Sequence, residues 1–107
     1  MMASSPTQLT LKKLQKENYP LSQVVEKWNS WGRVRQDLFG IIDVLAISET
    51  GETVGIQTTT LTNVGARLKK IADSNAIKHL RDAEWRIIVH GWYKKNNRWH
   101  VKEVDVS

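Results

Sequence analysis

Residues 38–60 read LFGIIDVLAISETGETVGIQTTT and decide the fold. Two apolar segments rich in β-branched residues, 41–47 and 53–60, flank the polar segment SETGE. That alternation predicts two strands joined by a tight turn, with Gly51 free to take a left-handed backbone conformation. The first strand is apolar on both faces, which is typical of a central strand in a sheet.

A single polar residue interrupts each of these strands, Asp43 in the first and Gln57 in the second. Pairing about a turn centred near residue 50 sets Asp43 opposite Gln57, and opposite residues share one face of the sheet. Thr59 follows two residues later on that face. An isolated buried carboxylate is costly. Two interpretations stay open. In the first, Asp43 lies at the edge of the sheet or hydrogen-bonds a neighbouring backbone amide; in the second, Asp43 and Gln57 are ligands of a hard cation such as Mg²⁺.

The rest of the chain predicts helices before and after this hairpin. Ser5-Pro6 can begin a helix over about 6–17, and the segment 22–28 is ambiguous but favours a strand. The further expected elements are a helix over 61–72, a helical turn over 76–81 and strands over 85–92 and 98–106. The apolar positions of the last strand slip by one residue, which predicts a bulge. The order α-(β)-β-β-α-β-β predicts an α/β fold with a mixed sheet flanked by helices.

The length of 107 residues predicts a single domain over 1–107, with residues 1–5 as a flexible tail. The chain has no cysteine and no run of about 20 apolar residues, so we expect a soluble, cytoplasmic protein without a membrane span. The net charge is +5, and residues 61–107 carry ten Lys and Arg against five Asp and Glu. This excess favours a polyanionic partner such as nucleic acid; the alternative is a basic face that only solvates the protein.

Four short motifs occur in order over about residues 24–104: RVRQDLFGIIDVLAI, VGIQTTT, NVGARLKKI and HGWYKKNNRW. They resemble small bacterial and phage proteins of the PD-(D/E)xK nuclease superfamily. That superfamily places an aspartate in one strand, an acidic-x-Lys tripeptide in the next strand and a basic helix after it. The resemblance implies a restriction-endonuclease-like fold and an endonuclease that uses Mg²⁺ or Mn²⁺ to hydrolyse DNA phosphodiester bonds.

Within that resemblance, Asp43 takes the place of the metal-binding aspartate and Gln57 that of the acidic residue. Both would therefore be metal ligands. Thr59 stands where the superfamily's catalytic lysine helps to activate the attacking water. The sequence departs from the pattern at both positions, because glutamine offers a neutral oxygen and threonine has no positive charge.

The resemblance also indicates which residues would compensate for these departures. Lys69 or Lys70, on the helix that follows, would supply the missing basic group. Asp37, in the DLFG motif, would replace the missing carboxylate. Glu26 would correspond to the upstream glutamate that many of these nucleases have.

Basic residues elsewhere are candidates for phosphate contacts. Arg33 and Arg35 alternate in the segment RVR, so both can point to one face; they contact phosphates or form ion pairs with Asp37 or Glu26. The other candidates are Arg67, Lys94 and Lys95, the last two being either phosphate contacts or solubilising turn residues.

Tryptophan is unusually frequent in this chain. Trp31 lies beside Gly32 in an expected loop and is the best candidate for an exposed ring that stacks on a base. Trp85, Trp92 and Trp99 lie in expected strands, where packing in the core is the better interpretation.

Three functions remain compatible with the sequence. The first is a metal-dependent DNA endonuclease, with a homodimer as a plausible means of cutting both strands. The second is a DNA-binding module of the same fold that no longer cleaves. The third is a structural protein in which Asp43 and Gln57 only hydrogen-bond to each other.

Overall fold

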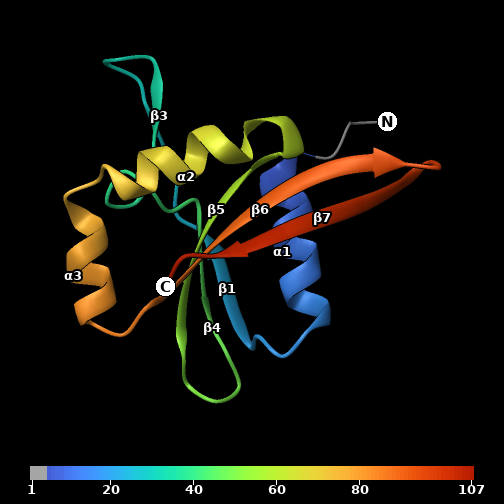
Figure 1. Ribbon diagram of the computed structural model, residues 1–107, viewed down its shortest axis with the longest axis horizontal. Coiled ribbons are helices and arrows are strands. Elements are labelled where there is room, and N and C mark those ends of the chain that lie inside the picture. The colour runs from blue at the N-terminus through green and yellow to red at the C-terminus, as the bar shows by residue number, and fades with distance from the viewer. Residues whose placement is uncertain (1–4) are drawn as a thin grey trace.

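In this computed structural model, which describes residues 5–107, a mixed β-sheet carries helices on both faces (Figure 1). The helices are α1 (Pro6–Lys16), the 3-10 turn η1 (Leu61–Asn63), α2 (Val64–Ala72) and α3 (Ala76–Asp82). The strands are β1 (Leu21–Val24), β2 (Lys27–Asn29), β3 (Val34–Gln36), β4 (Val44–Ile47), β5 (Thr53–Thr60), β6 (Arg86–Lys95) and β7 (Arg98–Asp105). In the described part of the chain, no helix is long and apolar enough to cross a membrane.

The five-stranded sheet has the order β1-β4-β5-β6-β7. Only β5 and β6 pair in parallel, through a crossover that contains η1, α2 and α3. The predicted α/β class with a mixed sheet is therefore confirmed. Strands β2 and β3 form a separate two-stranded ribbon, which the sequence did not predict as a unit.

The predicted hairpin is confirmed, including its register. Val44 pairs with Ile56 and Ile47 with Thr53, so that one further step sets Asp43 opposite Gln57. Gly51 in the turn has a φ of +86°, the conformation for which glycine was expected there.

The first strand of the hairpin is shorter than predicted. It begins at Val44 rather than at residue 41, because residues 37–42 fold into a turn closed by a bond from the N–H of Leu38 to the carbonyl of Ile42. Ile42 is nevertheless fully buried, so its apolar character serves the core and not a strand.

Alternating side chains of the sheet enter two separate cores, which explains the apolar runs of β4, β5 and β6. On one face, Leu14 of α1 packs against β-strand residues. On the other face, α2 and α3 cover the cluster of Ile41, Ile42, Val64, Ile71, Ile77, Leu80, Ile87 and Val89. Helix α1 begins at the N-cap Ser5, as predicted, so of the expected flexible tail only residues 1–4 lie outside the described residues.

Two expectations for the last strand are wrong. The register between β6 and β7 is continuous from Ile88 paired with Asp105 to Lys95 paired with Arg98, without the predicted bulge. Trp99 is 42% exposed rather than packed in the core. Both errors have one cause: β7 is an edge strand that is mostly exposed, so burial does not enforce strict alternation of its apolar residues.

Gly91 in β6 is required by the close approach of the crossover to the sheet. A Cβ at this position would lie 2.2 Å from Cγ2 of Val64 and 3.3 Å from Cα of Leu61. We expect Gly91→Ala to lower the free energy of unfolding by about 1–3 kcal/mol, because a stiff β-branched side chain and a backbone segment must both shift. Urea denaturation of the purified variant measures this loss.

Gly65 provides the matched control for that substitution. It lies in α2, and an added Cβ there would meet nothing within 4 Å. Gly65→Ala should leave stability unchanged or raise it by up to about 1 kcal/mol, since alanine is the better helix former. Equal stability of the Gly91→Ala variant and the unsubstituted protein would contradict the close packing of η1 and α2 on β6.

Candidate functional site

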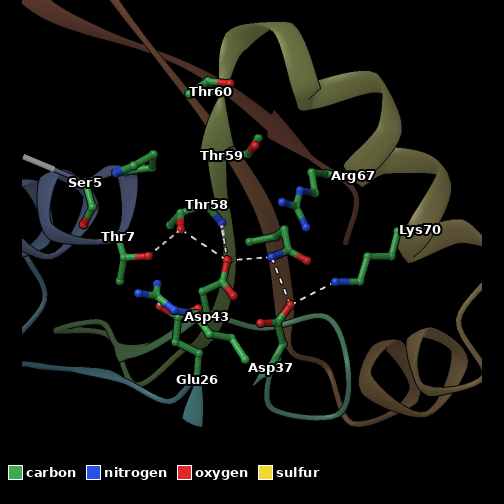
Figure 2. Close-up of a pocket in the computed structure, with 13 residues that line it drawn as sticks. Ser5, Thr7, Glu26, Asp37, Asp43, Thr58, Thr59, Thr60, Arg67 and Lys70 are labelled. Atoms are coloured by element: carbon green, nitrogen blue, oxygen red, sulfur yellow. Dashed lines mark hydrogen bonds and ion pairs between the residues drawn. The ribbon is translucent and has the colours of Figure 1, made fainter. Parts of the chain in front are cut away.

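A polar pocket of about 340 Å³ opens where the start of α1, the end of β5 and α2 meet (Figure 2). Most of its lining side chains are charged or carry a hydroxyl group. The lining residues are Ser5, Pro6, Thr7, Glu26, Arg35, Asp37, Asp43, Gln57, Thr58, Thr59, Thr60, Arg67 and Lys70. Every described lining residue therefore comes from residues 5–70.

Three acidic side chains, Glu26, Asp37 and Asp43, converge in this pocket. One carboxylate oxygen from each lies within 4.8 Å of the corresponding oxygens of the other two. Glu26 lies between β1 and β2, Asp37 directly follows β3, and Asp43 directly precedes β4. We call these three residues the acidic trio. Such a set of oxygen donors suits a hard divalent cation.

Asp43 is the most constrained member of the acidic trio, with 4% of its surface exposed. Its Oδ2 accepts hydrogen bonds from the backbone N–H of Thr58 at 2.8 Å, from the Thr58 hydroxyl at 3.2 Å and from Nε2 of Gln57. The interpretation that Asp43 bonds a neighbouring backbone amide is therefore confirmed. Asp43 also contacts Gln57, as the predicted register requires, and a cation at the pair stays a prediction.

Gln57 joins two members of the acidic trio. Its Nε2 donates to Oδ2 of Asp43 and, at 3.3 Å, to Oδ2 of Asp37. The side chain is 1% exposed, and its Oε1 has no hydrogen-bond partner among the described residues. A buried carbonyl oxygen without a partner costs about 1–3 kcal/mol. This oxygen in a polar pocket therefore points to a ligand that would satisfy it.

Because the carboxylates of Asp37 and Asp43 are close together, their pKa values move in opposite directions. Burial and the bond with the neighbouring Asp37 carboxylate together raise the pKa of Asp43 to about 7, outweighing the bonds from Thr58 and Gln57, which lower it. Burial also acts to raise the pKa of Asp37, but the bonds from Asp43 and Lys70 prevail and hold that pKa below its usual range. At pH values between these two pKa values, the pair thus holds about one proton between two carboxylates.

Two cationic side chains from α2 face the pocket. Figure 2 shows Arg67 and Lys70 extending from the helix toward the carboxylates. Nζ of Lys70 donates to Oδ2 of Asp37 at 3.0 Å. Lys69, the other candidate for the missing basic group, points away from the pocket, is exposed and pairs with Asp73 at 2.8 Å. The helical rotation of about 100° per residue allows only one of two adjacent lysines to face the site.

The remaining basic candidates are arranged differently. Arg35 lines the pocket and its Nη1 lies 3.3 Å from Oε1 of Glu26, the ion pair that was the alternative to a phosphate contact. Arg33 lies in the turn of the ribbon, outside the described pocket lining. Lys94 and Lys95 end β6 and also lie outside that lining, with Nζ of Lys94 5.4 Å from the ring centre of Trp99.

Sequence reasoning missed the threonines that support the acidic trio. Thr58 holds Asp43 with two hydrogen bonds, and its hydroxyl also lies 2.9 Å from that of Thr7 on α1. The run of three threonines at the end of β5 was the available signal, because threonines in a buried strand need hydrogen-bond partners. Thr59, at the position of the superfamily's lysine, is buried and lines the pocket as a neutral hydroxyl.

Comparison of the chain with family models, with curated proteins and with solved structures finds no match. We therefore infer the function from the geometry of the pocket and from the motifs of the sequence.

Proposed function

We propose that this protein is a metal-dependent endonuclease that hydrolyses DNA phosphodiester bonds at the acidic trio. One observation carries the proposal: three carboxylates converge in a pocket bordered by Arg35, Arg67 and Lys70. The same pocket is lined by Gln57, whose buried Oε1 has no partner among the described residues. Negative oxygens for a cation and positive groups for a phosphate are both required by this chemistry. The resemblance to PD-(D/E)xK nucleases supports the same proposal.

The donor set fits Mg²⁺ or Mn²⁺. Both ions prefer oxygen ligands, and the pocket offers three carboxylates. The oxygen of Gln57 would join them if the amide turned, since its Nε2 is the atom that contacts Asp37 and Asp43 here. The elevated pKa of Asp43 indicates that the crowded carboxylates favour a positive charge between them, which a proton supplies in part. Glu26, Asp37 and Asp43 would hold the ion. When bound, a divalent cation lowers the pKa of a water ligand and neutralises charge that develops on the phosphate.

The other residues of the pocket would position the substrate. Arg67 and Lys70 place two positive charges on the α2 side, where they attract a phosphate group. Lys70 also orients Asp37 by donating to its Oδ2. Thr59 can orient a water molecule through its hydroxyl, although it cannot stabilise an anion with a charge.

A DNA-binding module without cleavage is the second candidate. One observation favours it: Asp43 already accepts three hydrogen bonds, from Thr58 and Gln57, so a cation must compete with a satisfied carboxylate. In that case the basic side chains would bind phosphates, and the acidic trio would only fix the fold.

Cleavage assays separate these functions. Plasmid, single-stranded and branched DNA are incubated with the protein in Mg²⁺, in Mn²⁺ or in EDTA, beside an Asp43→Ala variant. If the protein is a metal-dependent nuclease, we expect cleavage that requires the cation and is absent in the Asp43→Ala variant. Cleavage that persists in Asp43→Ala would come from a contaminant and would end the proposal. Salt-sensitive gel shifts without any cleavage would establish the binding module instead.

Gln57→Glu tests the role of the amide in this pocket. The new carboxylate adds a negative charge beside Asp37 and Asp43, so we expect affinity for Mn²⁺ to rise about tenfold or more. The metal-free variant should be less stable, because the charge is buried and the two bonds donated by Nε2 are lost. Isothermal titration calorimetry and thermal denaturation measure the two effects.

Gln23→Glu is the matched control, since it adds the same charge on the exposed side of β1. It should change neither Mn²⁺ affinity nor stability by more than a small amount. Unchanged Mn²⁺ affinity in Gln57→Glu would show that position 57 does not contribute to a cation site.

A further inference from the structure

The β2–β3 ribbon is separate from the five-stranded sheet and projects from the body of the molecule (Figure 1). Trp28 and Arg35 are directly paired across its strands and therefore share one face. Oδ1 of Asn29 accepts hydrogen bonds from the backbone N–H groups of Trp31 and Gly32, at 3.0 and 3.3 Å, and so shapes the turn. The ribbon thus presents its aromatic side chains from an ordered hairpin.

Two large aromatic rings on this ribbon are open to solvent. Trp31 at the turn is 97% exposed and Trp28 is 62% exposed, while Trp92 in the sheet is buried. Val34, also on the ribbon, is exposed as well. Exposed indole rings gathered on one projecting element are unfavourable in water and indicate a surface that binds a partner.

The charge of the ribbon restricts the chemistry of that partner. Residues 27–36 contain three cations, Lys27, Arg33 and Arg35, and no acidic residue. A partner that complements this surface offers negative charges together with flat apolar faces. Nucleic acid with unpaired bases meets both conditions, because its phosphates are anionic and its bases can stack on an indole ring.

A groove connects the ribbon to the acidic trio. It has a volume of about 330 Å³ and is lined by Ser5, Thr7, Gln8, Val24, Glu26, Trp28 and Arg35. Glu26 and Arg35 also line the pocket of the candidate site. Trp28 therefore lines a groove that shares Glu26 and Arg35 with the pocket of the acidic trio.

We infer that the β2–β3 ribbon is a base-stacking arm for unpaired nucleotides next to the phosphate at the acidic trio. This inference rests on the proposed nuclease function and deepens it by naming the substrate class: single-stranded DNA, or DNA with unpaired bases at a branch or flap. In a continuous duplex both faces of each base are already stacked, so the indole rings would find no free face. Trp28 binds a base in the groove, and Trp31 binds a base farther along the strand.

Binding assays in EDTA test the arm without requiring cleavage. The full chain is titrated against a fluorescent single-stranded oligonucleotide, a forked duplex and a continuous duplex, followed by anisotropy. For Trp28→Ala and for Trp31→Ala we expect affinity for the first two ligands to fall about tenfold, with duplex affinity unchanged. The conservative variants Trp28→Phe and Trp31→Phe should retain most of the binding, because phenylalanine also stacks.

Trp99→Ala is the matched control, because Trp99 is a partly exposed indole on β7, outside the ribbon and outside the groove. It should leave all three affinities unchanged. Equal loss for single-stranded and duplex DNA, or no loss in the ribbon variants, would overturn the inference. Concentration-dependent dimers that Trp31→Ala abolishes, with DNA affinity unchanged, would overturn it in favour of a second copy of the chain.

The arm and the nuclease can fail separately. If the tryptophan variants still cleave DNA in a cation-dependent manner, with equal preference for duplex and single strands, the base-stacking arm is contradicted and the proposed nuclease function is retained. If the protein binds single strands through the tryptophans but cleaves no DNA, the proposed nuclease function is contradicted and the arm is supported as a binding element.

Discussion

Replacing Asp43 by asparagine should reduce cation-dependent DNA cleavage by about a thousandfold or more. Catalysis by a divalent cation contributes several kcal/mol to transition-state stabilisation, and Asp43 is the most buried of the three carboxylates that would hold the ion. Asparagine keeps an oxygen that can accept the bonds from Thr58, so the fold should persist. Single-turnover cleavage rates in Mg²⁺, beside circular dichroism spectra, measure the two expectations.

Asp73→Asn is the appropriate control for that variant. Asp73 is an exposed aspartate at the end of α2 whose described ion pair is with Lys69. It removes the same charge at a distance from the acidic trio and should leave the cleavage rate within about twofold, because exposed ion pairs contribute little. Cleavage by Asp43→Asn at the rate of the unsubstituted protein would exclude the acidic trio as the catalytic centre.

The stability of the metal-free protein should fall as the pH rises from about 4 to about 7. The pKa of Asp43 is raised to about 7 in the folded protein, above the value of about 3.9 for an unfolded aspartate. The folded state therefore binds more protons than the unfolded state between these values. The stability that the proton confers is complete below the lower value and is lost as the pH passes the higher one, a difference on the order of a few kcal/mol.

The difference between the unsubstituted protein and Asp43→Asn isolates this contribution. The comparison is needed because burial lowers the pKa of His90, beside Glu103 and Lys13, which makes stability rise with pH below about 6.5. The lowered pKa of Asp37 changes the stability only at pH values below the ordinary pKa of an aspartate. Urea denaturation at several pH values should show the unsubstituted protein losing stability relative to the variant.

Mg²⁺ should reverse this loss above pH 7, since a cation binds the ionised carboxylates and stabilises the folded state that holds it. Ca²⁺ or Mn²⁺ at the same concentration should act in the same direction, while monovalent salt of equal ionic strength should have a smaller effect. Stability that does not respond to divalent ions at pH 8 would argue against a cation site at the acidic trio.

The hairpin could be predicted because its evidence is local. Alternation, turn residues and the position of Gly51 together fix a register, and that register brought Asp43 and Gln57 together. The register alone determines on which face of the sheet each side chain lies, so this prediction requires no information about the rest of the chain. For the same reason α1, α2 and the two last strands were found with small errors at their ends.

The rest of the site depends on contacts between segments that no local pattern specifies. Glu26 and Asp37 were candidates only through the family resemblance, since neither lies in an apolar run that would indicate burial. The choice of Lys70 over Lys69 required the orientation of α2 relative to the pocket. Thr58 was missed because its role depends on Asp43 lying just before the start of β4, opposite the end of β5.

The exposed residues were the hardest to predict. The expected exposure of Trp31 was correct and the expected burial of Trp99 was wrong, although each tryptophan lies within two residues of an arginine. An edge strand differs from a central strand in having one neighbouring strand instead of two, and the two kinds of strand can have similar sequences. Edge position follows from strand order, which is a property of the whole chain.

Because the described lining of the pocket comes from residues 5–70, the chain separates into a part that determines chemistry and a part that supports it. Variant libraries that aim at a new substrate preference should therefore be confined to the first part. The exposed positions of β7 can be randomised independently to select for heat resistance or expression yield. Strand β6 should be kept, because it is mostly buried and pairs with the end of β5 that lines the pocket, and because replacing its Gly91 would move η1 and α2.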